Sequence, residues 1–436
     1  MTDRRSFDAV FVGGGVIGLG CAWRAARRGA RVAVLERSVP PAGATRVAAG
    51  MLAPVGELSF GEPELLQMTL ASARLYPQFV TELEAVSGEI TGYARQGALH
   101  IALDRDEAAQ LRRLHELQRS LELEAEWLPP RRCRQLEPGL TPSFNGGVHA
   151  PGEASIDPRA LARALMAALA AEGVEVRTGC EVFGGVFDGE RLAGVRVREA
   201  ATGGARGGGG WRGGGGPSGG AGEEELRADA VVLATGAWSG TTEWLPEHAR
   251  PPVRPVKGEV LELRGRDGSS PCERLVCSER VYLVPRPDSR LIVGATVEEQ
   301  GFDTTVTAGG VHELLREAYR LLPDIAEMEL LDTIAGLRPG TPDNLPLVGP
   351  GAIDGLILAT GHYRNGVLLA PLTADGVAAL LAGEPVPESL AAADPARLSF
   401  PPHGGQNDDR TQSPAPLPFA AQRATSDNRA ATEAGR

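Results

Sequence analysis

The chain has 436 residues, 42% of them hydrophobic and 23% charged, which is enough for roughly two or three domains' worth of buried core. Its formal net charge of −12 argues against a general nucleic-acid binder, which needs clustered cations, but says little about a small substrate. The apolar runs are too short to cross a bilayer and no signal-peptide pattern is visible, so we expect a cytoplasmic protein without membrane contact.

The first apolar run is the most informative segment. Phe7–Val12 predicts a short buried strand, and Gly13, Gly15 and Gly18 follow it with the G-x-G-x-x-G spacing of a strand-to-helix turn. In such a turn the first glycine permits the tight bend, the second lets a pyrophosphate approach the backbone, and the third lets the helix pack on the strand. The free N–H groups of the helix N-terminus favour phosphate binding.

The next elements complete a dinucleotide-binding unit. Val16–Gly29 predicts a helix and Arg31–Glu36 a second apolar strand that ends in Glu36. The carboxylate there is placed to accept hydrogen bonds from an adenosine ribose with a free 2′-hydroxyl. Strand, turn, helix, strand and acid fall in order and predict dinucleotide binding, but they leave NAD and FAD both open.

The following segments alternate between loops, helices and short strands. Helical periodicity and turn residues mark a small-residue loop, three helices and one strand: loop Ala42–Met51, helix Pro63–Ser87, strand Gly97–Leu103, helix Asp106–Leu121 and helix Arg131–Glu137.

The middle of the chain returns to strands. After a helix over Pro158–Gly173 and a strand ending at Thr178, Glu181–Val197 predicts a hairpin with its turn at Asp188-Gly189. The tract 201–222 is dominated by glycine and cannot bury a core, so we interpret it as a mobile surface insertion. The strand pattern resumes at Leu226–Leu233.

The last third has strands, two helices and a polar end. The predicted elements are strands Val253–Leu263, Glu279–Pro285 and Arg290–Thr296, helix Val311–Leu322, strand Leu356–Thr360 and helix Asn365–Leu381. The polar composition of residues 400–436 predicts a disordered tail.

Six segments in fixed order resemble the D-amino acid oxidase superfamily and, within it, the glycine oxidase family of thiamine biosynthesis. They span Phe7 to about Gly383. These segments are the glycine motif with Glu36-Arg37, then Ala44–Met51, Val231–Trp238, Val281–Arg286 with Val293–Thr296, Ala335–Asp343 and Ala359–Pro371.

The resemblance implies an α/β FAD-binding, Rossmann-like domain plus an α+β substrate domain with a mainly antiparallel sheet. It places residues 1–90, 150–245 and 333–390 in the FAD-binding domain, and residues 91–149 and 246–332 in the substrate domain. The substrate is expected between the two, at the flavin face.

The resemblance also implies FAD as the cofactor. It is expected to be non-covalent, because no cysteine lies in Thr333–Asp343, near which related sarcosine oxidases attach the flavin. The implied FAD-binding residues are Gly13, Gly15, Val16, Ile17, Gly18, Glu36, Arg37, Ala44, Thr45, Ala49, Gly50, Met51, Val182, Gly236, His362, Arg364, Asn365, Gly366, Val367 and Leu368.

For the substrate, the resemblance points first to Arg338, whose guanidinium fork would hold an amino acid's carboxylate. The other implied substrate residues are Arg364, Tyr282, Met51 and Arg280. Arg280 stands where some family members have a histidine, and Val297 where some have a methionine. Both departures bear on substrate selectivity.

The implied reaction is hydride transfer from the amino acid's Cα to the flavin, without a metal or a catalytic acid–base residue. Glycine would give the imine or glyoxylate with ammonia, and O₂ would give hydrogen peroxide. The imine could also pass to a thiazole synthase. The sequence leaves open the oligomeric state, an oxidase or dehydrogenase for sarcosine or small D-amino acids, and a flavin-binding protein without turnover. The glycine motif alone also fits an NAD-dependent dehydrogenase.

Overall fold

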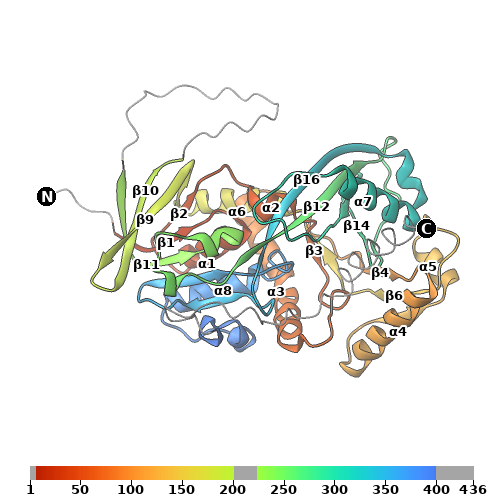
Figure 1. The fold of residues 1–436 in the computed structure, drawn as a ribbon, viewed down its shortest axis with the longest axis horizontal. Helices are drawn as coiled ribbons and strands as arrows, with labels where there is room; N and C mark the ends of the chain where they lie inside the picture. Colours follow the sequence, from red (N-terminus) through yellow and green to blue (C-terminus); the bar gives the residue numbers. More distant parts are fainter. Residues whose placement is uncertain (1–5, 201–222, 399–436) are drawn as a thin grey trace, which may run out of the picture.

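The computed structural model describes residues 6–200 and 223–398. The predicted insertion at 201–222 and the predicted tail at 400–436 lie outside these residues. The described chain forms two large sheets, one at the left and one at the right of Figure 1, with helices packed around each.

The first sheet contains the glycine motif. Its strands run in the order β17-β18-β11-β1-β2-β8, and β11, β1, β2, β8 and β18 pair in parallel. A hairpin of β9 and β10 extends from β11. The bounds are β1 Phe7–Val12, β2 Val32–Glu36, β8 Glu175–Thr178, β9 Cys180–Asp188, β10 Arg191–Glu199, β11 Glu224–Leu233, β17 Leu347–Pro350 and β18 Leu356–Thr360.

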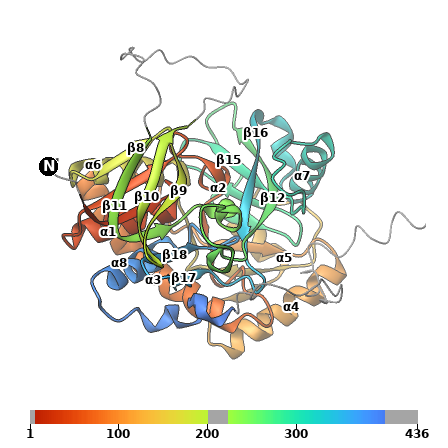
Figure 2. The ribbon, with the colours of Figure 1, turned by 60° about the vertical axis from the view of Figure 1, so that its left-hand side comes forward.

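This sheet is buried on both faces, which is why its central strands are continuous apolar runs. Phe11 and Val34 pack against helices on one face, and Val10 and Leu35 pack against the hairpin on the other. Figure 2 shows the hairpin in front of the helices. The helices are α1 Val16–Arg27, α3 Pro63–Ser87, α6 Pro158–Ala171 and α8 Ala370–Leu381.

The second sheet runs β16-β12-β15-β14-β13-β4-β6-β5 and is antiparallel except where β13 meets β4. Its helices are α4 Arg105–Ser120, α5 Pro130–Leu136 and α7 Ala308–Leu321. Its strands are β4 Ala98–Ile101, β5 Glu126–Leu128, β6 Gly147–Ala150, β12 Arg254–Arg264, β13 Leu275–Cys277, β14 Tyr282–Pro285, β15 Arg290–Gly294 and β16 Glu329–Gly340.

Short elements connect the sheets. The loop predicted over Ala42–Met51 contains a one-turn helix, α2 Gly43–Val47, and leads into β3 Met51–Leu52, which pairs with β7 Ala154–Ser155. The 3₁₀ helices are η1 Gly236–Thr241, η2 Glu247–Ala249, η3 Pro323–Glu327, η4 Glu388–Ala393 and η5 Pro395–Arg397. In the described part of the chain, no helix is both long and apolar enough to span a membrane.

The predicted start of the last helix, at Asn365, is wrong. The regular helix α8 begins at Ala370. Pro371 has no N–H to donate to the Val367 carbonyl. The Tyr76 hydroxyl donates to that carbonyl instead, and the Ser72 hydroxyl donates to the Leu368 carbonyl at 2.6 Å.

The second sheet reaches further along the chain than its predicted segment. Strand β16 includes residues 333–340, which the sequence analysis placed in the FAD-binding domain, and it pairs with β12 along its whole length. The α/β sheet beside a mainly antiparallel sheet confirms the predicted fold class. The exact division into domains remains a prediction.

Candidate active site

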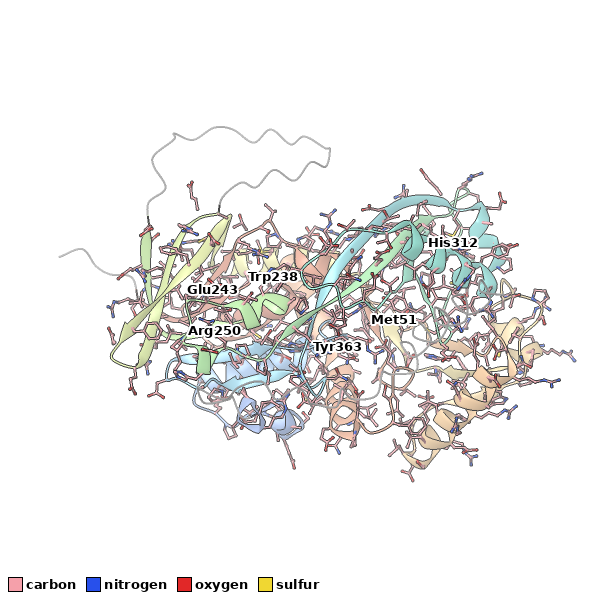
Figure 3. All side chains as sticks on the ribbon, in the orientation of Figure 1. Met51, Trp238, Glu243, Arg250, His312 and Tyr363 are labelled. Atoms are coloured by element: carbon pink, nitrogen blue, oxygen red, sulfur yellow. The ribbon has the colours of Figure 1, made fainter. Side chains whose placement is uncertain are left out.

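One cavity of about 1580 Å³ extends from the glycine motif of the first sheet to strands β12, β14 and β16 of the second. Met51 and Tyr363 are seen near the middle of the molecule, between the two sheets (Figure 3). Most of the predicted site residues line this cavity. Those that do not are Gly18, Asn365 and Leu368.

The glycine turn at one end of the cavity leaves no room for side chains where the chain bends. Gly13 has φ +115°, and a Cβ there would lie 2.3 Å from the Ala234 carbonyl oxygen. A Cβ on Gly18 would lie 1.9 Å from the Gly13 oxygen, so Gly18 serves helix packing. At Gly15 the nearest atom is the Thr45 hydroxyl at 3.4 Å, which leaves the backbone open to the cavity.

The N-terminus of α1 can bind an anion. Its N-cap residue, Gly15, has no side chain to cap the helix. The Val16 N–H donates to the Thr45 hydroxyl at 3.0 Å, while the Ile17 and Gly18 N–H groups meet no acceptor in the described residues. Free N–H groups with the helix dipole behind them suit a pyrophosphate.

Glu36 is held at the end of β2 by the backbone. Its Oε2 accepts the Gly14 N–H at 2.7 Å, and its Oε1 accepts the Ser38 N–H at 2.8 Å. Each carboxylate oxygen keeps a second lone pair for a ribose hydroxyl. Beside it, the Arg37 guanidinium stacks on the Trp238 ring at 4.3 Å, so two residues from different strand ends close the same side of the cavity.

The segment that carries Ala49, Gly50 and Met51 runs along the cavity wall and is fixed at both ends. Gly50 has φ +71°, and a Cβ there would lie 2.0 Å from the Ile156 carbonyl oxygen. The buried Arg286 guanidinium donates to the Ala49 carbonyl. Burial lowers the pKa of Arg286 to about 10, so it remains a cation. A rigid, small-residue backbone is therefore presented to the cavity.

The segment after β18 forms another part of the cavity wall. Gly361 has φ +77° and Tyr363 φ +47°, and the Tyr363 N–H donates to the Pro339 carbonyl of β16 at 2.9 Å. The N–H groups of Gly366 and Val367 meet no acceptor within the described ranges, and both residues line the cavity. These donors can stabilise negative charge that develops on a bound group, although the regular helix starts only later.

His362 lies behind this wall as a neutral side chain. It is 2% exposed, and its Nε2 lies 2.9 Å from the Thr373 hydroxyl. Burial lowers its pKa to about 3. A neutral imidazole hydrogen-bonded to the Thr373 hydroxyl provides no cation to the cavity. The backbone contact of this segment to the cofactor remains a prediction.

We expect this histidine to make the protein less stable in mild acid. Because its pKa is about 3 in the folded chain and about 6.5 unfolded, its contribution is complete above pH 6.5 and decreases as the pH falls towards 3. Between pH 7 and pH 5 it accounts for about 2 kcal/mol of lost unfolding free energy. His362→Gln should show a correspondingly smaller loss in urea titrations at the two pH values.

The matched control is His312→Gln. His312 is exposed on α7, in the upper right of Figure 3. This variant should lose as much stability between pH 7 and pH 5 as the wild type. If the His362 variant and the wild type lose equal amounts, the imidazole is not held neutral by burial.

At the other end of the cavity, Arg338 lies flat on β12. Its Nη1 donates to the carbonyl oxygens of Lys257 at 3.2 Å and Thr296 at 3.1 Å. A Cβ on Gly258 would lie 2.3 Å from the same Nη1, so only glycine leaves room for the guanidinium. Because one edge is fixed by the backbone, the remaining donors can form a fork for a planar anion.

Tyr282 stands beside this arginine on β14. A Cβ on Gly294, its cross-strand partner, would lie 2.5 Å from the phenol ring, which lies over that glycine. Burial raises the pKa of the Tyr282 phenol, partly offset by the Arg338 guanidinium. The phenol is therefore a neutral hydroxyl that can donate to the same anion as Arg338.

The other predicted substrate residues lie around this end. Arg364 lines the cavity, and its buried Nε finds no hydrogen-bond partner in the described residues. Met51 also lines the cavity, while Arg280 and Val297 are exposed at its edge. The structure thus brings the predicted substrate residues to one cavity with the predicted cofactor residues.

Sequence reasoning missed Glu57 and His100, which line the same cavity. Burial raises the pKa of Glu57, against the opposing effect of Arg364. His100 lies 3.7 Å from the buried carboxylate of Glu153, which also accepts the Gly56 N–H. The only sequence signal for Glu57 was that it lies six positions after Met51, which ends the predicted cofactor segment. His100 comes from a distant strand and had none.

Comparisons with known proteins agree with this geometry. The model of the FAD dependent oxidoreductase family matches residues 8–380. A bifunctional protein ThiO/ThiG of Trichormus variabilis is 36% identical over 370 residues, which are 84% of this chain and 51% of that protein. The chain spans about half the length of such bifunctional relatives.

Two further similarities cover whole proteins. A glycine oxidase of Geobacillus kaustophilus is 33% identical over 422 residues, which are 93% of this chain and 99% of that protein. The crystal structure of glycine oxidase from the same organism matches with a TM-score of 0.78 and 32% identity, covering 92% of this chain and 100% of that chain.

Proposed function

Because this chain belongs to the family of FAD dependent oxidoreductases, we propose that it oxidises glycine with FAD as hydride acceptor and O₂ as final electron acceptor. The observation that carries this proposal is the position of Arg338. Its guanidinium is held by two carbonyl oxygens in the same cavity as the dinucleotide-binding turn. A carboxylate bound to Arg338 would therefore lie in the same cavity as the cofactor.

The described residues fit FAD along the length of the cavity. Glu36 would receive the ribose hydroxyls, the N-terminus of α1 the pyrophosphate, and the Met51 segment the ring system. When bound, FAD supplies the two-electron acceptor that no amino-acid side chain offers. No cysteine lies in Thr333–Asp343, which supports non-covalent attachment.

The chain's own residues would orient the substrate and hold its charge. The Arg338 fork binds the carboxylate, and the Tyr282 hydroxyl donates to the same group. Arg364 adds a second positive charge to the lining of the same cavity. This arrangement favours small amino acids that bear a free α-carboxylate.

The ammonium group of the substrate must first lose a proton, because the nitrogen lone pair that this frees stabilises the developing imine when the Cα hydride leaves. Positive charge from Arg338 and Arg364 disfavours an ammonium in the cavity. Loss of hydride from Cα and a proton from nitrogen gives the imine, which water hydrolyses to glyoxylate and ammonia. The two electrons reduce O₂ to hydrogen peroxide.

The product also suggests a biological role. The resemblance to ThiO/ThiG proteins supports delivery of the imine to a thiazole synthase in thiamine biosynthesis. A cytoplasmic location, a homo-oligomeric state and direct hand-off to that partner are parts of this proposal. Sarcosine or a small D-amino acid as the preferred substrate is the nearest alternative within the family.

The test is hydrogen peroxide release by the purified yellow protein in air. Glycine, sarcosine, D-alanine, D-proline and L-alanine are compared at equal concentrations. We expect peroxide with glycine among the leading substrates and none with L-alanine. Preference for a bulkier D-amino acid would move the role to D-amino acid oxidation. No peroxide from any of them would favour a dehydrogenase or a flavoprotein without turnover.

A further inference from the structure

A cation is buried on the back face of β12, directly behind the substrate end of the cavity. The Lys257 side chain is 1% exposed, and its Nζ lies 2.9 Å from Glu259 Oε1 and 3.4 Å from Glu298 Oε2. Lys257 and Glu259 are two residues apart on one strand, so their side chains share a face. Burying such a cluster has a desolvation cost that apolar packing would avoid.

The front face of the same strand carries the arginine. Gly258 separates Lys257 from Glu259, and because side chains alternate along a strand, its hydrogen points to the opposite face. The guanidinium of Arg338 occupies that face and donates to the Lys257 carbonyl at 3.2 Å. Lys257 therefore contributes both the buried cation behind the strand and one of the two carbonyl oxygens that accept from Arg338. Lys257 itself does not line the cavity.

The second carbonyl that holds the arginine belongs to the same network. The Thr296 hydroxyl accepts the Glu259 N–H at 2.9 Å and donates to Glu298 Oε1 at 2.7 Å. The Glu298 N–H donates to the Lys257 carbonyl at 3.0 Å, and the Lys257 N–H donates to the Glu298 carbonyl at 2.9 Å. Both acceptors of the guanidinium are thus held in one hydrogen-bonded unit.

We propose that Lys257 is a positioning residue for the substrate carboxylate: its salt bridges to Glu259 and Glu298 fix the two carbonyl groups that aim the Arg338 fork. This inference rests on the proposed function, because it takes Arg338 as the carboxylate ligand. Lys257 touches neither substrate nor cofactor and acts through the arginine.

Removing the cation should affect carboxylate capture more than the chemical step. Without Lys257, the buried carboxylate of Glu259 and the partly buried carboxylate of Glu298 lose the cation that they share. Repulsion between the two then favours a conformation in which Glu298 turns toward solvent. The Thr296 backbone then loses the hydroxyl bridge that holds it. The Arg338 guanidinium keeps its charge but is no longer held in one orientation. A small displacement of its paired N–H donors weakens binding of the substrate carboxylate sharply.

The experiment compares the holoenzymes of the wild type, Lys257→Met and Lys257→Arg. The readouts are KM and kcat for glycine, and the Kd of acetate, an unreactive carboxylate, from changes in the visible absorbance of the bound flavin. In Lys257→Met we expect KM and the acetate Kd to rise roughly tenfold while kcat changes less than about twofold. Lys257→Arg should restore most of the affinity because it keeps the buried cation.

The control is Glu137→Gln, which removes the charge of another buried carboxylate and so weakens its pairing with an arginine. Glu137 is 1% exposed, pairs with Arg274 at 3.2 Å and accepts the Arg274 N–H at 2.8 Å, outside the cavity. It should lower Tm without changing KM or the acetate Kd. If Lys257→Met fails to fold, Glu298→Gln replaces it, since this variant keeps the Lys257–Glu259 pair and should raise both constants in the same way.

Unchanged KM and acetate Kd in the folded variant would overturn the inference, as would equal rises in the Glu137 control, because the effect would then be general destabilisation. These results leave the proposed function standing when the wild type oxidises glycine and binds acetate. A wild type that does neither overturns the proposed function and the inference with it.

Discussion

Arg338→Ala is expected to abolish most of the glycine activity while leaving FAD bound. The loss removes a hydrogen-bonded charge partner of the substrate carboxylate, for which truncation costs about 3–4 kcal/mol, or roughly a hundred- to a thousand-fold in kcat/KM. The cofactor should remain because Arg338 lies on β16, at the end of the cavity away from the glycine turn. The measurement is steady-state peroxide release against glycine concentration, with FAD content from absorbance.

Two further variants separate charge from geometry. Arg338→Lys keeps the charge but not the planar fork, so it should recover only part of the affinity. Arg264→Ala removes a positive charge from an exposed site on β12 outside the cavity, and it should leave the glycine kinetics unchanged. Glycine kinetics in Arg338→Ala that match the wild type would remove this arginine from the site.

The second large effect is expected from Gly13→Ala. At φ +115° an L-residue is strained, and its Cβ would meet the Ala234 carbonyl oxygen at 2.3 Å, so β1 and β11 could not keep their spacing. Strain and overpacking together should cost about 2–5 kcal/mol of unfolding free energy. Because the bend also shapes the FAD site, the variant should purify with little flavin and show a weaker FAD Kd after reconstitution.

Gly29→Ala is the matched control for this variant. Gly29 also has positive φ, at +88°, but a Cβ there meets nothing within 4 Å. This variant should lose only about 1–2 kcal/mol of unfolding free energy, from the strain of an L-residue at positive φ, and it should retain its full FAD content. If Gly13→Ala also binds FAD with full stoichiometry and wild-type Kd, the turn does not shape the cofactor site.

The first βαβ unit could be predicted from the sequence because local rules determine it. The apolar strand, the glycine spacing and the acidic residue at the end of the second strand are all short-range features, and the strand Phe7–Val12 has the predicted bounds. The long helix Pro63–Ser87, which has a clear periodicity of its own, also has the predicted bounds. The family resemblance is confirmed by the FAD dependent oxidoreductase model over residues 8–380. Glu36 meets the backbone N–H group of Gly14 across the turn, as the motif requires.

The second sheet was harder to predict because its strands pair over long distances. Strand β16, which carries Arg338, was recognised only as a motif, and its place beside β12 depends on pairing between residues about 80 positions apart. The predicted start of α8 was wrong because the hydroxyl groups of Tyr76 and Ser72, nearly 300 positions away, donate to the carbonyl groups of Val367 and Leu368. No local pattern carries such information.

Residues that support the site were also invisible in the sequence. In the sequence, Lys257 looks like an ordinary surface lysine. Only the pairing of β12 with β16 places Gly258 beneath the Arg338 guanidinium. The contacts of Lys257 with the carboxylates of Glu259 and Glu298 on the back of the strand are likewise visible only in the structure. Buried polar clusters follow from tertiary packing, and hydrophobic periodicity does not encode them. The roles of the individual site residues remain predictions for the variants above.

The central claim, that this chain oxidises glycine at its bound FAD, is tested most directly without oxygen. The purified holoenzyme is mixed with glycine under anaerobic conditions, and the visible absorbance of the flavin is followed, with L-alanine as the control. We predict that glycine bleaches the flavin, L-alanine does not, and air restores the colour. A flavin that stays oxidised in glycine, yet is bleached by dithionite, would contradict the account.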